Sequence, residues 1–197
     1  MKKIILIFTL ILFTFFSYSQ DSKGYLGIGI GLSIPGGEDV KDVGYKSGLS
    51  LNLLNAGYLF SDSFGLTLNW GGTASSSKND CDDCTYALGY FSIGPLIRVS
   101  AGESMTIDFK PQIATTSAQF ENLLVSGDKW TASTTGFVFG TSLNFGKEKG
   151  LGFSLNADYV ASGKINEYDL NNGNIVVVSS PSKVSAFTVG AGIMYRF

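Results

Sequence analysis

The strongest constraint on this sequence is an alternation between apolar and small or polar residues, and its clearest example is the segment 187–197. Phe187, Ile193 and Phe197 belong to the apolar series, whereas Thr188 and Arg196 belong to the intervening series. Successive side chains of a strand point to opposite faces, so one face of this segment suits an apolar environment and the other does not. Together with the final aromatic residue, this pattern is typical of a membrane β-strand.

The same two-faced pattern occurs eight times. After the N-terminal segment, no stretch approaches 18 consecutive apolar residues, so membrane-spanning helices are excluded from the rest of the chain. A closed barrel is the other structure that satisfies every backbone group in hydrocarbon. We therefore predict an all-β fold, an eight-stranded antiparallel up-and-down transmembrane β-barrel. The expected strands cover about 25–34, 46–58, 64–71, 85–99, a segment starting near 104, 134–145, 151–160 and 187–197.

One expected strand, 85–99, changes phase in its apolar pattern. If its large residues all face outward, the chain must slip by one position between Tyr90 and Phe91. A β-bulge produces such a slip. We therefore predict a bulge there, with Tyr86, Leu88 and Tyr90 on the lipid face.

Smaller irregularities are expected in three other places. Pro95 and Pro111 have no backbone N–H to donate to a ladder, so each predicts a local bulge. The second strand is irregular near Leu54 and Asn55, where the alternation fails.

The connections alternate between long and short. The short ones cover 61–63, 100–103 and 146–150, and the long ones cover 35–45, 72–84, 119–133 and 161–183. Outer-membrane barrels have short periplasmic turns and longer external loops, which this alternation fits. The apolar runs 121–125 and 175–178 inside the long loops predict strands that extend above the membrane. Alternatively, these runs offer a partner an apolar patch or an exposed edge.

The N-terminus predicts export. Lys2 and Lys3 precede an apolar run of about 13 residues, which is shorter than a membrane-spanning helix and typical of a signal peptide. We expect a signal sequence at 1–19 and a barrel domain at 20–197. Without the signal, 12 basic residues face 16 acidic ones, so nucleic acid is not an expected partner.

A soluble eight-stranded barrel of the lipocalin type is the main structural alternative. Such a barrel directs its large apolar residues inward and carries a charged exterior. In this chain only 15% of residues are charged, and the face opposite the large residues consists of Gly, Ser, Thr and Asn. That composition favours a narrow barrel interior over a solvated surface.

The alternation places five ionisable residues in the barrel interior. An eight-stranded barrel is just wide enough for its side chains to fill it, so pairing between opposite charges favours a plugged lumen over an open pore. A small passive channel remains the alternative. The predicted interior charges are Arg98, Asp108, Lys110, Asp158 and Arg196.

Catalysis is not expected. The chain contains no histidine, which is the usual base for a serine or cysteine nucleophile and a common metal ligand. Asp108 or Asp158 could be proposed as an interior acid, but ionic side chains commonly fill a small barrel. We predict no catalytic residue, no cofactor and no metal site.

The sharpest local motif is Cys81-Asp82-Asp83-Cys84 in the second long loop. In an exported chain, a small-loop disulfide between Cys81 and Cys84 is the simplest interpretation. Metal binding by the two sulfurs and neighbouring carboxylates is a weaker alternative, because one such pair lacks a second pair or histidines. A redox role would need a thioredoxin-like context, which is missing.

With its signal peptide, eight two-faced strands, alternating loop lengths and terminal Tyr195-Arg196-Phe197, the chain resembles the small outer-membrane β-barrels of Gram-negative bacteria, the OmpA/OmpX-like group of porin-type barrels. The resemblance implies that Tyr195 and Phe197 are recognised by the barrel-assembly machinery. The sequence ends at Phe197, so we expect no periplasmic domain. Barrels of this size that modify lipid A rely on a histidine, which this chain lacks.

These observations predict a protein of the outer membrane, surrounded by its lipid, with a structural or surface-interaction role. The expected partners are the assembly machinery during biogenesis and an extracellular ligand or partner at the external loops, whose identity the sequence does not reveal. The alternative function is passive transport of small or hydrophobic solutes.

Overall fold

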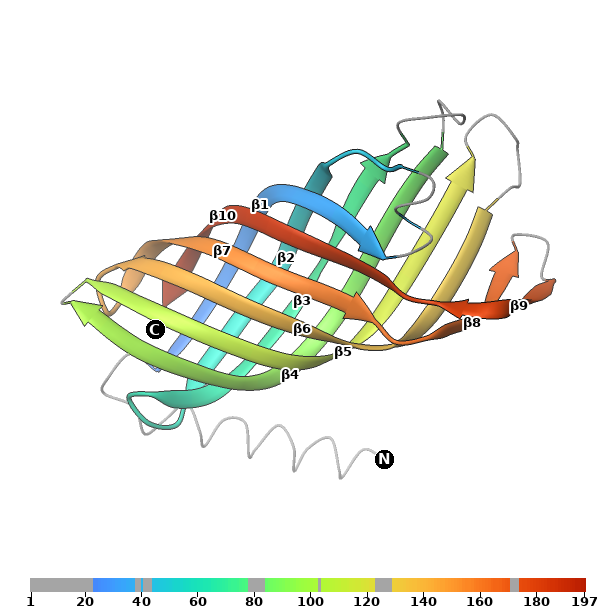
Figure 1. The fold of residues 1–197 in the computed structure, drawn as a ribbon. Coiled ribbons are helices and arrows are strands. Elements are labelled where there is room, and N and C mark those ends of the chain that lie inside the picture. Colours follow the sequence, from blue (N-terminus) through green and yellow to red (C-terminus); the bar gives the residue numbers. More distant parts are fainter. Residues whose placement is uncertain are drawn as a thin grey trace, which may run out of the picture.

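The computed structural model describes residues 23–37, 40, 44–77, 84–102, 104–122, 129–170 and 174–197. The predicted signal sequence lies outside these residues. The described chain forms ten strands that belong to one sheet (Figure 1). They are β1 (Gly24–Gly37), β2 (Gly48–Leu59), β3 (Phe64–Ser76), β4 (Cys84–Gly102), β5 (Met105–Asn122), β6 (Lys129–Gly146), β7 (Gly150–Ser162), β8 (Ile165–Leu170), β9 (Ile175–Ser182) and β10 (Val184–Arg196).

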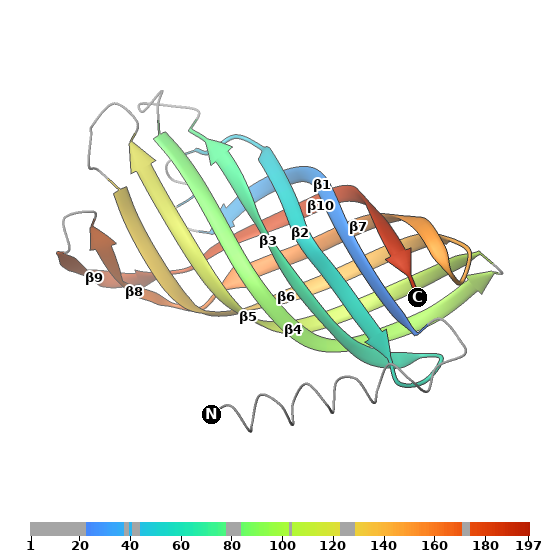
Figure 2. The ribbon, with the colours of Figure 1, turned by 180° about the vertical axis from the view of Figure 1, so that it is seen from behind.

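Eight of these strands close into a barrel. Each of β1 to β6 pairs antiparallel with the next strand, and β10 pairs with both β7 and β1. The closing β1–β10 ladder runs without a break from Tyr25↔Arg196 to Gly37↔Val184. The continuous wall is visible from both sides of the molecule (Figures 1 and 2). The predicted eight-stranded antiparallel barrel is confirmed.

The two remaining strands form a hairpin outside the barrel wall. β8 pairs with β9, and its end joins the start of β6 through Trp130↔Leu170. β5 and β6 contain 18 residues each, whereas about 9 to 11 residues of a tilted strand cross the hydrocarbon. We call β8, β9 and the adjoining ends of β5 and β6 the extension, which projects at the long-loop end (Figure 1).

The extension also tests the apolar runs in the long loops. The run 175–178 lies in β9, so its predicted strand structure is confirmed. The run 121–125 leaves the described residues after Asn122, the last residue of β5.

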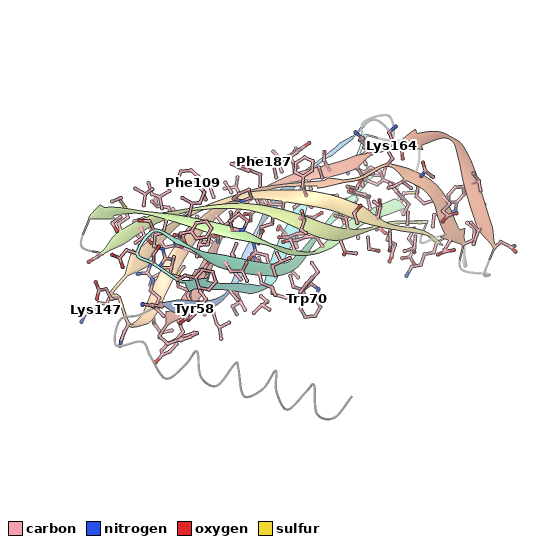
Figure 3. All side chains as sticks on the ribbon, turned by 90° about the horizontal axis from the view of Figure 1, so that it is seen from below. Tyr58, Trp70, Phe109, Lys147, Lys164 and Phe187 are labelled. Carbon is pink, nitrogen blue, oxygen red and sulfur yellow. The ribbon has the colours of Figure 1, made fainter. Side chains whose placement is uncertain are left out.

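An apolar belt covers the outside of the barrel. On β1 alone, Leu26, Ile28, Ile30, Leu32 and Ile34 are each at least half exposed. Figure 3 shows outward side chains of other strands, such as the labelled Trp70, Phe109 and Phe187. This arrangement is opposite to that of a soluble lipocalin-type barrel. No helix among the described residues is long and apolar enough to cross a membrane.

The predicted bulge in β4 is wrong. The pairing of β4 with β3 keeps one register from Phe64↔Ile97 to Ser76↔Thr85. The large side chains before Phe91 therefore point into the barrel, and Tyr86 and Leu88 are completely buried. Glycines make room for them: a Cβ atom on Gly71 would lie 2.9 Å from Tyr90 Oη.

The prolines cause no bulge either. The β4–β5 register is the same at Ile93↔Ile113 and at Ile97↔Phe109, which places Pro95 opposite Pro111. The two residues that cannot donate to a ladder thus share one position, so neither forces the other strand out of register.

A true bulge lies in β2, where the alternation fails in the sequence. The registers of β2 with both neighbours shift by one residue around Leu53 and Leu54. The extra residue changes which residues face inward, so Leu53 is outward and Asn55 is buried. The predicted irregularity near Leu54 and Asn55 is confirmed.

Candidate functional site

The lumen contains a bidentate ion pair on the side of the short turns. Arg98 of β4 and Asp108 of β5 are direct cross-strand partners. Arg98 Nε and Nη2 donate to the two carboxylate oxygens of Asp108, both at 2.7 Å. Asn144 Nδ2 adds a third hydrogen bond to Asp108 at 2.9 Å, and the Arg98 guanidinium lies 5.6 Å from the centre of the Tyr25 ring. This geometry is the strong, orientation-specific form of a charge pair.

A second pair of charges lies across Gly140. Lys110 of β5 and Asp158 of β7 are the cross-strand neighbours of this glycine. Both side chains occupy the space that a Cβ atom of Gly140 would need. Lys110 is 1% exposed and Asp158 5%, and Lys110 Nζ donates to Ser142 Oγ. We call Arg98, Asp108, Lys110 and Asp158 the ionic layer.

Amide side chains fill the space next to the ionic layer. Gln112 Oε1 accepts hydrogen bonds from Asn69 Nδ2 at 2.9 Å and from Ser92 Oγ at 3.1 Å. A cavity of about 20 Å³ beside Tyr90 and Asp158 has room for about one water molecule. The middle of the barrel is therefore filled by side chains.

The long-loop end of the lumen is closed by aromatic rings. Ring centroids of Tyr86 and Phe120 lie 5.0 Å apart, and Tyr45 lies 5.5 Å from Tyr86. Tyr168 of β8 lies 6.1 Å from Phe120 and 5.9 Å from Trp130. We call these five residues the aromatic cap. Tyr86 and Tyr168 belong to a buried apolar cluster, and Tyr45 and Phe120 pack against it. The cluster also includes Val40, Leu88, Ile165 and Val184.

A further expectation from the sequence is wrong in part. We expect Trp70, Trp130, Tyr86 and Tyr159 to form a girdle at the membrane interface, because such girdles are typical of outer-membrane barrels. Trp70 and Tyr159 do face outward. Tyr86 and Trp130 instead join the cap, because they occupy inward-facing positions where β4 and β6 rise towards the extension.

The short-turn end of the lumen is open and polar. A cavity of about 420 Å³, which we call the vestibule, is lined there by Lys23, Asp62, Arg98, Thr106, Glu148 and Arg196. Arg196 is only 6% exposed. Its Nη1 donates to the backbone oxygens of Gly146 at 3.3 Å and Lys147 at 3.2 Å.

The extension presents apolar side chains to solvent. Ile175 and Val177 of β9 are 61% and 74% exposed. Among the described residues, β9 pairs with β8 alone, so its other edge is unpaired. Unpaired backbone groups beside exposed apolar residues are a template for pairing with another chain.

The remaining predicted site residues are the cysteines of the second long loop and the aromatic residues at the end of β10. Cys84 begins β4 and is disulfide-bonded, while Cys81 lies outside the described residues. Tyr195 and Phe197 face outward. The backbone of Phe197 is hydrogen-bonded in both directions to Gly24, which ties the end of the chain to the first strand.

The sequence places the ionisable residues on the inward face but misses the aromatic cap. A strict alternation from Tyr86 through Leu88 and Tyr90 to Arg98 was available as a signal. This alternation can be recognised only if large residues are assumed to face inward where the neighbouring strands carry glycine. The contribution of β8 has no comparable signal, because Tyr168 reaches the cap only through the pairing of β8 with β6 and β9.

No protein-family model matches the sequence, and a comparison with curated proteins finds no match. Among solved structures, the chain is similar to Neisserial surface protein A, with 13% identity and a TM-score of 0.62 over 91% of this chain and 100% of that one. It is also similar to Ail, the attachment invasion locus protein of Yersinia pestis, with 19% identity and a TM-score of 0.54 over 90% and 100%. The outer membrane protein OprG from Pseudomonas aeruginosa matches with 12% identity and a TM-score of 0.53 over 90% and 97%. The fold of this chain is therefore that of the small outer-membrane β-barrels, as the sequence predicts.

Proposed function

We propose that this chain is a non-conducting, non-enzymatic barrel of the outer membrane that acts through its external surface. The observation that carries the proposal is the filled lumen: the ionic layer occupies its middle and the aromatic cap its long-loop end. A solute would have to displace buried, mutually bonded side chains to pass. The extension is then the largest described feature available for interaction outside the membrane.

The apolar belt and the alternation of loop lengths support the orientation in the membrane. The belt suits hydrocarbon, and short turns are typical of the periplasmic side. We therefore place the vestibule at the periplasm and the extension outside the cell. The outward Tyr195 and Phe197 are proposed as the signal for the assembly machinery.

The edge of β9 is the proposed contact for an extracellular partner. Addition of a strand would satisfy its backbone groups, and Ile175 and Val177 would bury apolar surface. One barrel with a similar fold is named for attachment and invasion, and its structure is also known in complex with the heparin analogue sucrose octasulfate. A role in surface attachment is therefore the form of this proposal that we would test first.

The test compares adhesion of Gram-negative cells that display the wild-type chain or a variant of Val177. Val177→Lys places a charge on the edge strand and should reduce adhesion to cultured epithelial cells to the level of cells without the protein. Val177→Thr is the matched control, because it keeps the β-branched shape and should retain most adhesion. Equal adhesion of Val177→Lys and wild-type cells, at equal amounts of folded barrel, would contradict the proposal.

A further inference from the structure

Arg196 is a buried cation whose described contacts are all uncharged. Its Nη1 donates to two backbone oxygens, and Nη2 lies 3.5 Å from Thr106 Oγ1. Among the residues that the structure describes, no carboxylate lies within ion-pair distance of it. Its Nε is buried and has no hydrogen-bond partner. A charge with such burial is normally paired.

Arg98 shows the contrast within the same vestibule. Its guanidinium is held by both oxygens of Asp108 and is therefore neutralised. Arg98 and Arg196 are the two arginines of the chain. One of them completes a closed pair, and the other lines the cavity with no carboxylate within ion-pair distance among the described residues.

The vestibule has the size and lining of an anion site. Its volume of about 420 Å³ exceeds that of a few water molecules, and Lys23 supplies a second cation. Two carboxylates, Asp62 and Glu148, also line it, but both residues are exposed at the mouth. Solvent weakens the repulsion from exposed charges much more than it weakens the attraction of a buried guanidinium.

We propose that Arg196 and Lys23 form an anion-binding site in the vestibule, which takes a soluble ligand with a phosphate or carboxylate group. The planar guanidinium matches both groups through charge-assisted hydrogen bonds, and Nη2, which carries two N–H groups and has one long described contact, has a donor left for them. The site goes beyond the proposed role of the external surface. With the proposed orientation the ligand comes from the periplasm, but the binding site itself does not depend on that orientation.

The two arginines make a direct experiment available. Mature protein labelled with ¹⁵N-arginine and refolded in detergent micelles should give two Nε–Hε signals in an NMR spectrum. Titration with inorganic phosphate, and separately with acetate, should shift the Arg196 signal in a saturable way and leave the Arg98 signal nearly unchanged. The stronger of the two responses identifies the preferred anionic group.

Variants separate this site from general charge effects. Arg196→Gln should weaken phosphate binding by roughly ten- to a hundredfold, as expected for the loss of charge-assisted hydrogen bonds. Lys164→Gln removes an exposed cation at the opposite end of the barrel and should change the affinity less than twofold (Figure 3). Heat-modifiable migration on a gel verifies that each variant forms a barrel.

An Arg196 signal in the folded wild-type protein that responds to neither anion would overturn the proposal, whatever the behaviour of the variants. A phosphate affinity that Lys164→Gln and Arg196→Gln lower equally would overturn it as well. Because these measurements involve neither β9 nor cell adhesion, their failure is distinguishable from failure of the proposed surface function.

Discussion

At the long-loop end of the lumen five aromatic rings pack against one another, whereas at the short-turn end a buried guanidinium lines an open polar cavity. The first end is closed by apolar packing that β8 completes from outside the barrel wall. The second end keeps about 420 Å³ of space beside a guanidinium that has no carboxylate within ion-pair distance among the described residues. Between them, the ionic layer separates the two ends.

From this difference we infer separate roles for the two ends of the lumen. The cap closes its end of the lumen through packing between rings, so its role is to stabilise the fold. A buried charge without a counter-charge is costly unless something else stabilises it. We infer that Arg196 is left without a counter-charge because it binds an anion in the vestibule. The cap and the ionic layer fill the rest of the lumen.

The largest effect should come from breaking the ionic layer. Asp108→Asn removes the counter-charge of Arg98 and should lower the free energy of unfolding by about 3–5 kcal/mol. Urea unfolding of the refolded protein in lipid vesicles measures this change. The double variant Arg98→Gln/Asp108→Asn should recover part of the loss, and a double variant as unstable as the sum of both single variants would contradict the pairing.

A smaller effect is expected from the aromatic cap. Tyr86→Ala opens a cavity among the rings, but it also removes a buried hydroxyl that has no hydrogen-bond partner. The two contributions oppose each other, so we expect a loss of about 2 kcal/mol in the same unfolding experiment. Tyr86→Phe is the control, because it keeps the ring and should be neutral or stabilising. A strong loss in Tyr86→Phe would show that the hydroxyl has a partner.

A substitution at the rim of the vestibule should produce a modest increase in phosphate affinity. Glu148→Gln removes an exposed negative charge near the proposed anion site. Phosphate affinity should rise roughly two- to fivefold at low salt, and the gain should shrink as salt screens the charge. Calorimetric titration at two ionic strengths measures this. Weaker phosphate binding by the variant would place Glu148 among the groups that hold the ligand.

The smallest effect should appear at alkaline pH in the cap. Burial raises the pKa of the Tyr45 hydroxyl above its usual value near 10. The folded state thus favours the neutral phenol, so its stabilisation is present below pH 10 and is lost as the pH rises through the folded pKa. Ultraviolet absorbance of tyrosinate, compared between wild type and Tyr45→Phe, should assign a late-titrating group to Tyr45. A group that titrates near 10 would show that the cap leaves Tyr45 in solvent.

Parts of the fold that depend on local alternation are predictable from the sequence. β1 and β10 follow strict period two, which puts Thr188 on the inward face and Ile28 and Phe187 on the outward face, and the structure has the same faces. The failed alternation at Leu54 likewise marks the bulge in β2. In each case the sequence of a single strand is enough to predict which residues face inward or where the bulge lies.

The interior of the barrel is less predictable because it depends on what lies opposite. Tyr86, Leu88 and Tyr90 have the size and polarity of lipid-facing residues. They fit inside the barrel because other strands carry glycine. For Arg196, the alternation predicts an inward position. Whether a carboxylate lies beside it depends on the register of strands distant in sequence, which alternation does not specify.

The most direct test of the filled lumen is single-channel recording of the refolded mature protein in planar bilayers. We expect a folded barrel, identified by heat-modifiable migration, that gives no conductance steps because the ionic layer and the aromatic cap occupy its interior. Reproducible steps whose size changes in Lys110→Gln would contradict this and would make the chain a small channel.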